Sequence, residues 1–203
     1  MTLFRSSTLL FLALVAGHVP AQETRRSNLA IRAQGGGGDA LIAGFTVGPG
    51  GNKTVLIRAV GPTLAAFGVG GALADPRLEL FSGSNHIAEN DNWRTLDAAA
   101  FSAVGAFALG ADSRDAALVA ELAPGSYTAQ VTGVGANAGV TLVEVYEVSA
   151  GATRLVNLST RAHVGTGDNI LVPGITPGHR HSSPAIRRGA FLPEQNTASV
   201  RSR

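Results

Sequence analysis

The residues best suited to chemistry in this 203-residue sequence form one short polar run. Asn90, Asp91 and Asn92 are consecutive, and Glu89 precedes them. Carboxylate and amide oxygens are the hard ligands that Ca²⁺ prefers, so Asn90, Asp91 and Asn92 are candidate calcium ligands. Their spacing is not that of an EF-hand loop, and an Asx-rich turn at the end of a strand is the alternative interpretation. Three more carboxylates could join such a site, at Asp97, Asp112 and Asp115.

Trp93 follows this run directly and is the candidate ligand-binding aromatic residue. β-Sandwiches host many carbohydrate sites, and the flat face of an aromatic ring suits a sugar. Tyr127 and Tyr146 alternate with apolar neighbours, so we predict that both belong to the core. A calcium-assisted domain that binds a carbohydrate-type ligand through Trp93 is therefore the second functional hypothesis.

Residues for catalysis are harder to assemble from this sequence. A nucleophile needs a base within hydrogen-bond reach, and His86 lies in a short polar segment typical of a surface strand. The glycine-rich stretches 35–38 and 133–139 precede predicted strands, whereas a nucleotide-binding loop must open a helix. We therefore interpret them as tight turns and predict a protein that is not an enzyme and has no cofactor, apart from the calcium considered above.

Charge and cysteine content narrow the possible partners. Residues 22–178 hold ten Lys and Arg against thirteen Asp and Glu, and the excess of positive charge lies in the last 25 residues. Nucleic-acid binding needs a clustered basic face, so we predict no nucleic-acid partner. The chain has no cysteine, which excludes disulfides and cysteine metal sites and leaves stability to packing and hydrogen bonds.

The N-terminus has the three zones of a cleavable secretory signal. Arg5 precedes an apolar run of about ten residues, and small residues end at Ala21 before a polar Gln22. We predict a signal peptide over 1–21, a linker over 22–26 and no membrane span in the mature chain, since the run is too short to cross a bilayer. The expected location is secreted or cell-surface, with an unknown cell-surface or extracellular partner.

Short runs rich in β-branched residues, separated by Gly, Pro, Asn and Asp, predict strands through most of the mature chain. The predicted strands cover residues 28–33, 39–47, 53–60, 77–82, 85–89, 116–122, 126–132 and 139–148. Helical turns are predicted at 62–67 and 95–101, both too short to link parallel strands. Pro124 and Gly125 suit a type II turn, so 116–122 and 126–132 are expected to form a hairpin.

These elements predict an all-β fold, a two-sheet antiparallel sandwich with Greek-key or jelly-roll-like connections and one or two short helical turns. Residues 27–150 would form this module. Its interior, without disulfides, would hold the exported part of the chain together.

An internal echo suggests that a second unit begins after this module. Residues 28–39 match 157–168 at seven positions, and with one inserted residue 44–48 align with 174–178. We predict that 151–178 are the opening strands of a truncated second repeat, which either dock onto the module or fray because two strands alone are marginal. A histidine at 163, where the first copy has Gln34, is not expected to be essential. Residues 179–203 change in character and are predicted to be a disordered basic tail.

Several segments together resemble a repeat module found in tandem in bacterial secreted and cell-surface proteins. The resemblance rests on residues 55–64, 73–81, 89–93 and 157–169, and it covers roughly 27–178. The stretch around 123–127 with 139–146 is also distantly similar to the bacterial pre-peptidase C-terminal domain. The first resemblance implies a module with no assigned activity. The second implies a β-sandwich appendage of a secreted protein.

The first functional hypothesis is therefore a non-catalytic extracytoplasmic module with a structural, spacer or adhesion role. The calcium-assisted ligand-binding domain is the alternative.

Overall fold

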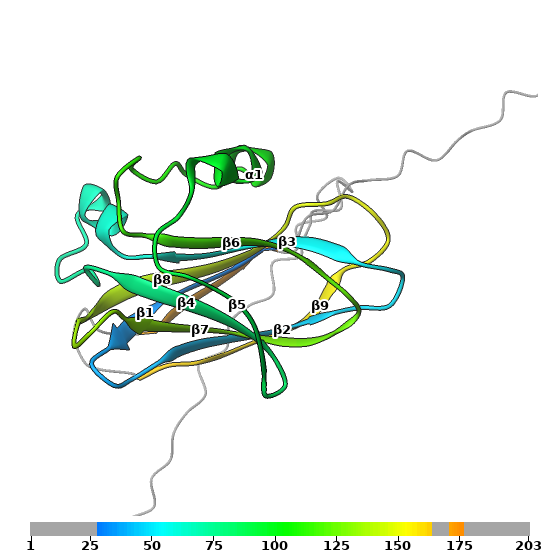
Figure 1. Cartoon of the computed structure of the whole chain (residues 1–203), viewed down its shortest axis with the longest axis horizontal. Coiled ribbons are helices and arrows are strands. Elements are labelled where there is room, and N and C mark those ends of the chain that lie inside the picture. The colour runs from blue at the N-terminus through cyan, green and yellow to red at the C-terminus, as the bar shows by residue number, and fades with distance from the viewer. Residues whose placement is uncertain (1–27, 164–170, 177–203) are drawn as a thin grey trace, which may run out of the picture.

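The computed structural model describes residues 28–163 and 171–176, which form two antiparallel five-stranded sheets packed face to face (Figure 1). Sheet A has the order β10 (Val172–Thr176), β1 (Asn28–Gly36), β8 (Ala138–Glu147), β3 (Lys53–Val60) and β6 (Ala116–Leu122). Sheet B has the order β5 (Asn85–Asn90), β4 (Pro76–Ser82), β7 (Gly125–Gly133), β2 (Leu41–Val47) and β9 (Leu155–Arg161). The predicted all-β, two-sheet antiparallel sandwich is confirmed.

The path of the chain between the sheets is that of a jelly roll. The first eight strands are ordered β1-β8-β3-β6 in one sheet and β2-β7-β4-β5 in the other, with β9 and β10 added at two edges. Apart from β4 and β5, consecutive strands lie in different sheets. Of the two connection types expected from the sequence, the jelly roll is the one that the strand order shows.

The local elements follow the sequence closely. The eight predicted strands are present, each within three residues of the expected bounds. The 3-10 helix η1 (Pro62–Phe67) is confirmed, and the second helical segment comprises η2 (Thr95–Asp97) and the helix α1 (Ala98–Val104). Glycines at 68 and 105 end η1 and α1 in the left-handed conformation, with φ of 76° and 72°.

The core between the sheets is built from alternating side chains. Along β7, Tyr127, Ala129 and Val131 are buried, while the residues between them are partly exposed. The same alternation appears in β1 and β2. This confirms the period-2 interpretation, and Tyr127 and Tyr146 are both buried as predicted.

The predicted hairpin between β6 and β7 is wrong. β6 pairs with β3 in sheet A, whereas β7 pairs with β2 and β4 in sheet B. The turn at 123–125 carries the chain across the sandwich, and the Tyr127 hydroxyl donates to the Ala123 carbonyl at 2.8 Å, as in a tyrosine corner. Both strands direct apolar residues into one core, so alternation alone cannot distinguish a neighbour in the same sheet from one across the sandwich.

The strands beyond residue 150 dock onto the module. β9 pairs with β2 and β10 pairs with β1, so each sheet gains a fifth strand. The predicted signal peptide at 1–21, the linker at 22–26 and the tail at 179–203 lie outside the described residues. Within the described part of the chain, the helices are all too short or too polar to cross a membrane.

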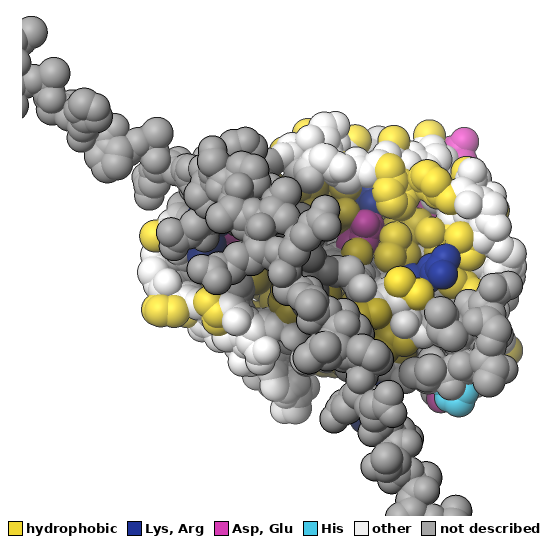
Figure 2. All heavy atoms as spheres, turned by 180° about the vertical axis from the view of Figure 1, so that it is seen from behind, with side chains coloured by type: hydrophobic (Ala, Val, Ile, Leu, Met, Phe, Trp, Pro, Cys, Tyr) yellow, Lys and Arg dark blue, Asp and Glu magenta, His cyan; other side chains and the backbone are white. Residues whose placement is uncertain are grey.

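Sheet A also has a covered outer face. η1, α1 and the loop that follows α1 enclose a second apolar cluster against β3, β6 and β8. Figure 1 shows α1 above β6 and β3, and the view from behind shows hydrophobic side chains gathered around a few charged ones (Figure 2).

Candidate functional site

The predicted calcium residues form a hydrogen-bonded turn at the end of β5. Asn90 Nδ2 donates to the Asn92 carbonyl at 2.8 Å, and Asn92 Nδ2 donates to Asp91 Oδ1 at 3.2 Å. Asn90 Oδ1 accepts the Ala117 N–H at 3.0 Å, which ties this turn to β6. Asn90 Oδ1 and Asp91 Oδ1 thus already have donors within the chain. The calcium site stays a prediction.

Two of the three more distant carboxylates considered for that site, Asp97 and Asp115, have other partners. Asp97 is buried and accepts hydrogen bonds from Arg94 at 3.1 and 3.2 Å. Asp115 is fully buried, and its Oδ1 accepts the Gly61 N–H at 2.7 Å while its Oδ2 accepts the Thr63 hydroxyl. Asp115 therefore fixes the start of η1 on β6, because it satisfies backbone groups that the 3-10 helix leaves open.

Trp93 lies against the second apolar cluster. Its ring is partly buried and 5.4 Å from that of Phe101 on α1. Its Nε1–H donates to the Gly110 carbonyl at 2.9 Å and to Ser113 Oγ at 3.1 Å. These contacts hold the loop after α1 in place, so part of the ring that the sequence offered to a ligand is engaged within the chain.

A buried ion pair lies under the same loop, where sequence reasoning did not find it. Arg58 on β3 is fully buried, and its Nε–H donates to Glu144 Oε2 at 2.9 Å. Its guanidinium also lies over the rings of Phe107 and Phe101, with centroids 4.3 and 5.0 Å away. An arginine in the otherwise apolar run 55–60 was the available signal. Its partners come from separate parts of the chain.

Tyr146 completes this buried group. Its hydroxyl donates to Glu144 Oε1 at 2.6 Å. Burial and the neighbouring carboxylate raise the pKa of Tyr146 well above its ordinary value. The hydroxyl therefore keeps its proton at physiological pH and serves as a donor to Glu144. Each charged or polar group in this cluster thus has a partner, as burial requires.

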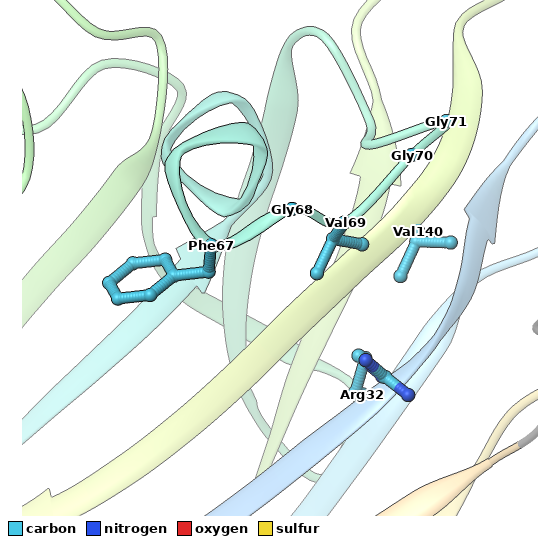
Figure 3. A pocket seen from close by; sticks show the side chains of 7 residues that line it. All are labelled: Arg32, Phe67, Gly68, Val69, Gly70, Gly71 and Val140. Carbon is cyan, nitrogen blue, oxygen red and sulfur yellow. The ribbon is translucent and has the colours of Figure 1, made fainter.

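One hollow lies on the outer face of sheet A. It has a volume of about 570 Å³ and is lined by Arg32, Val140 and the segment 67–71. Val69 and Val140 lie beside one another near Arg32, while the Phe67 ring points away from them (Figure 3). The lining consists of one cationic side chain and otherwise of apolar residues and glycines. This set of residues does not indicate a particular reaction.

A smaller hollow of about 200 Å³ borders the predicted calcium run. Its lining consists of Arg77, Glu89, Asn90 and Asp91. Arg77 hydrogen-bonds to Glu89, and this bond, followed by the charge of Glu79, raises the pKa of Arg77. A cation from the protein therefore already neutralises the carboxylate nearest to Asn90 and Asp91.

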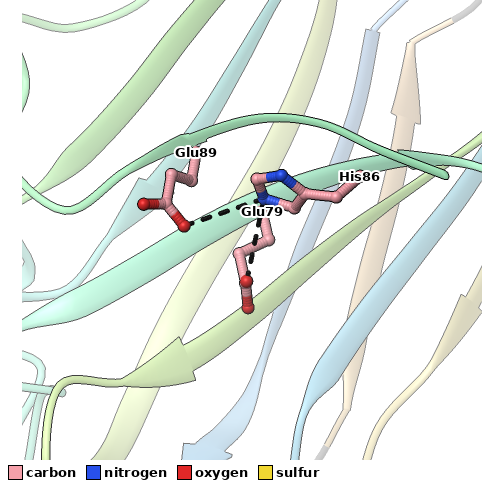
Figure 4. A group of neighbouring side chains, drawn as sticks. All are labelled: Glu79, His86 and Glu89. Carbon is pink, nitrogen blue, oxygen red and sulfur yellow. Dashed lines mark ion pairs between the residues drawn. The ribbon is translucent and has the colours of Figure 1, made fainter.

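Glu79, His86 and Glu89 form the one group of metal-ligating side chains found in the described residues. His86 Nε2 is 3.8 Å from Glu79 Oε1 and 3.7 Å from Glu89 Oε2 (Figure 4). Glu79 and Glu89 are directly paired across β4 and β5, so knowledge of that hairpin's register would have found them. All three side chains are solvent-accessible, and Arg77 contacts both carboxylates.

At one edge of each sheet, the module pairs with a strand from beyond residue 150. β9 pairs with β2 from Ile42 to Val47, and Thr160 Oγ1 donates to the Ile42 carbonyl at 3.1 Å. The buried Glu147 at the end of β8 anchors the start of β9, because its Oε1 accepts the Leu155 N–H at 2.7 Å.

Comparisons of this chain with protein-family models, with curated proteins and with solved structures find no match.

Proposed function

We propose that this chain is a non-catalytic, extracytoplasmic structural or spacer module, one unit of a tandem array whose units are joined by strand addition. The observation that carries this proposal is the position of β9 and β10. Both come after the module in sequence, and each continues one of its sheets through backbone pairing. Strand addition joins two units through main-chain hydrogen bonds.

The sequence supports the same function. Residues 157–168 and 174–178, which include most of β9 and part of β10, echo the start of the module. The resemblance to tandem modules of bacterial surface proteins agrees with an array. The zones of residues 1–21 suit an exported chain. Because the chain has no cysteine, its stability depends on packing and hydrogen bonds.

Coupling between the module and β9 can be tested by replacing Ser159 and Thr160 with proline in the full chain. Two successive residues of a strand direct their N–H groups to opposite sides, so one of the two prolines removes a donor to β2. We expect the free energy of unfolding in urea to fall by about 1–3 kcal/mol, the cost of an unsatisfied buried group.

The matched control is Ser159→Ala with Thr160→Val, which keeps both backbone N–H groups and removes only the side-chain hydroxyls. This control is expected to lose much less stability than the proline pair. If the proline pair unfolds at the same urea concentration as the parent chain, β9 does not couple to the module and the proposed function is wrong.

Export is tested separately by expressing the full chain in a bacterium and fractionating the cells. We expect the protein outside the cytoplasm, with a mature N-terminus at Gln22. Accumulation in the cytoplasm with the N-terminal segment intact would contradict the extracytoplasmic part of the proposal.

Calcium-assisted ligand binding is the second candidate, because Asn90 and Asp91 line a hollow with Glu89. Under the first proposal, the melting temperature of the full chain is the same in Ca²⁺ and in EDTA. A rise in Ca²⁺ that is lost in Asp91→Asn would favour the second candidate instead.

A further inference from the structure

The internal echo relates two strand pairings to each other, that of β10 with β1 and that of β9 with β2. The echo relates residues 28–39 to 157–168 with an offset of 129, and residues 44–48 to 174–178 with an offset of 130. The later offset also relates 42–43 to 172–173. In β1 and β10, Asn28 lies opposite Thr176. Their counterparts, Asn157 and Thr46, lie opposite one another in β9 and β2.

The equivalence holds along the whole pairing of β1 with β10. The five pairs 28–176, 29–175, 30–174, 31–173 and 32–172 correspond to 157–46, 158–45, 159–44, 160–43 and 161–42. Every pair is present in the second register. Exchanging 28–32 with 157–161 and 42–46 with 172–176 therefore leaves the paired positions unchanged. A two-fold axis has this property.

One further contact agrees with this axis. Gln34 forms an isolated antiparallel bridge with His163, and the offset of 129 makes these two residues equivalent. A residue that pairs with its own equivalent must lie beside the axis. His163 therefore lies beside the axis, a position that a search for catalytic histidines would not predict.

We infer that the edges of β1 and β2 together form a self-complementary docking surface for a second copy of this module, and that β9 and β10 occupy it within the chain. This inference rests on the proposed function and names the partner. The edge of β1 accepts a segment like β2, and the edge of β2 accepts a segment like β1. In a symmetric pair, β1 of one copy lies against β2 of the other, with Arg32 opposite Ile42.

The side chains at the centre of this pairing leave room for the second copy. Gly44 lies close to Ser159, whose Oγ would be 2.4 Å from a Cβ added at Gly44. In the symmetric pair, the smaller Ala30 takes the place of Ser159. Gly44 in turn takes the place of Gly174 opposite Ala30, where a glycine is already accommodated. At this central pair the symmetric pairing therefore replaces each residue with one of the same or smaller size.

Competition decides which occupant is present. β9 and β10 belong to the same chain as the module, and a short linker gives an effective concentration of about 1 mM or more. The parent chain is therefore expected to be a monomer in dilute solution. A second copy can take the surface when β9 and β10 are both released.

The test uses the full chain with Ser159→Pro and Thr160→Pro to release β9 from β2. Gly174→Pro and Ile175→Pro in the same chain release β10 from β1. Because the chain has no cysteine, Arg32→Cys and Ile42→Cys report on one contact without background. Opposite residues of an antiparallel pair have Cα atoms about 4.5–5.5 Å apart, which suits a disulfide. We expect this variant to have twice the monomer mass in sedimentation and to form a disulfide-linked dimer under mild oxidation.

The matched control moves one cysteine out of register. Arg32→Cys with Thr46→Cys uses the same two strands and the same outer face, but the paired positions are about 13 Å apart. We expect several-fold less covalent dimer than with the in-register pair. Equal yields from the two pairs would overturn the inference, as would a released variant that melts cooperatively and stays monomeric.

If the released variant does not melt cooperatively, both cysteine pairs are placed in the parent chain, and crosslinking is followed during refolding at rising protein concentration. In-register dimers that increase with concentration support the inference, and equal yields from the two pairs overturn it. The outcomes also separate the two proposals. Lost stability without dimers rejects only the second copy, whereas unchanged stability rejects the coupling itself.

Discussion

The two sheets of this jelly roll come from similar short strands, yet their outer faces differ. β3 and β8 in sheet A are buried along nearly their whole length, because η1, α1 and the loop after α1 cover them. β2 and β7 in sheet B alternate between buried and partly exposed residues. β5 at the edge of sheet B is exposed or partly exposed throughout.

The difference governs what a charged residue does in each sheet. Arg58 and Glu144 on sheet A are buried, so each must be neutralised by a partner. Arg77 and Glu89 on sheet B form a similar pair in contact with solvent, where water screens them. The buried polar cluster around Arg58 and Glu144 therefore has a structural role in sheet A. The cluster of Arg77 and Glu89 on sheet B lies at the solvent-accessible surface.

The largest expected effect comes from breaking the buried pair with Arg58→Ala. This change leaves Glu144 buried without its cation and removes the guanidinium from two aromatic rings. We expect a loss of about 3–5 kcal/mol in the free energy of unfolding, measured in urea. The double variant Arg58→Met with Glu144→Leu removes both charges and should recover most of it. A loss no larger than that of the partly exposed Arg32→Ala would contradict this view of sheet A.

Asp115→Ala tests the attachment of η1 to sheet A. The buried N–H group of Gly61 loses its acceptor, and we expect a loss of about 1–3 kcal/mol. Asp115→Asn keeps one oxygen at the same position and serves as the control, with a smaller loss expected. Equal urea midpoints for Asp115→Ala and the parent would show that the carboxylate does not hold η1.

Tyr146→Phe tests the covered outer face of sheet A through the pH dependence of its stability. Burial and Glu144 raise the pKa of Tyr146 in the folded protein, whereas the unfolded residue loses its proton near pH 10. The unfolded state then binds fewer protons, so the stability of the parent falls as pH rises above about 10. We expect Tyr146→Phe to lose about 1 kcal/mol at neutral pH and to show a shallower alkaline decline. Parallel declines in the two proteins would contradict the shift.

The smallest effect is expected on sheet B, from Arg77→Ala. This residue contacts Glu79 and Glu89 in solvent, so the urea midpoint should stay within experimental error in both low and high salt. Arg77→Lys keeps the charge and serves as the control. A salt-dependent loss as large as that of Asp115→Ala would remove the contrast between the sheets.

Sequence patterns predicted elements well where the signal was local. The alternation in 126–132 and the turn residues around the strands gave boundaries within a few residues, because each depends on neighbouring positions. The hairpin of β6 and β7 failed because a Pro-Gly turn suits both a return within a sheet and a crossing between sheets.

The candidate site shows the same division. Asn90, Asp91 and Asn92 were recognised by type, but their hydrogen bonds to one another and to β6 required the fold. The Glu79, His86 and Glu89 group was missed because its members come together only through the register of β4 and β5.

By itself, the amino-acid sequence determined that this chain forms short strands with one buried side, and that residues 157–178 echo its beginning. These properties depend on the order of apolar, polar and turn residues along the chain. Only the tertiary structure decided which strands are neighbours, that α1 and the loop after it bury Arg58, and that β9 and β10 meet β2 and β1 in equivalent registers. Those choices depend on contacts between residues far apart in sequence, whose free energies no local pattern contains.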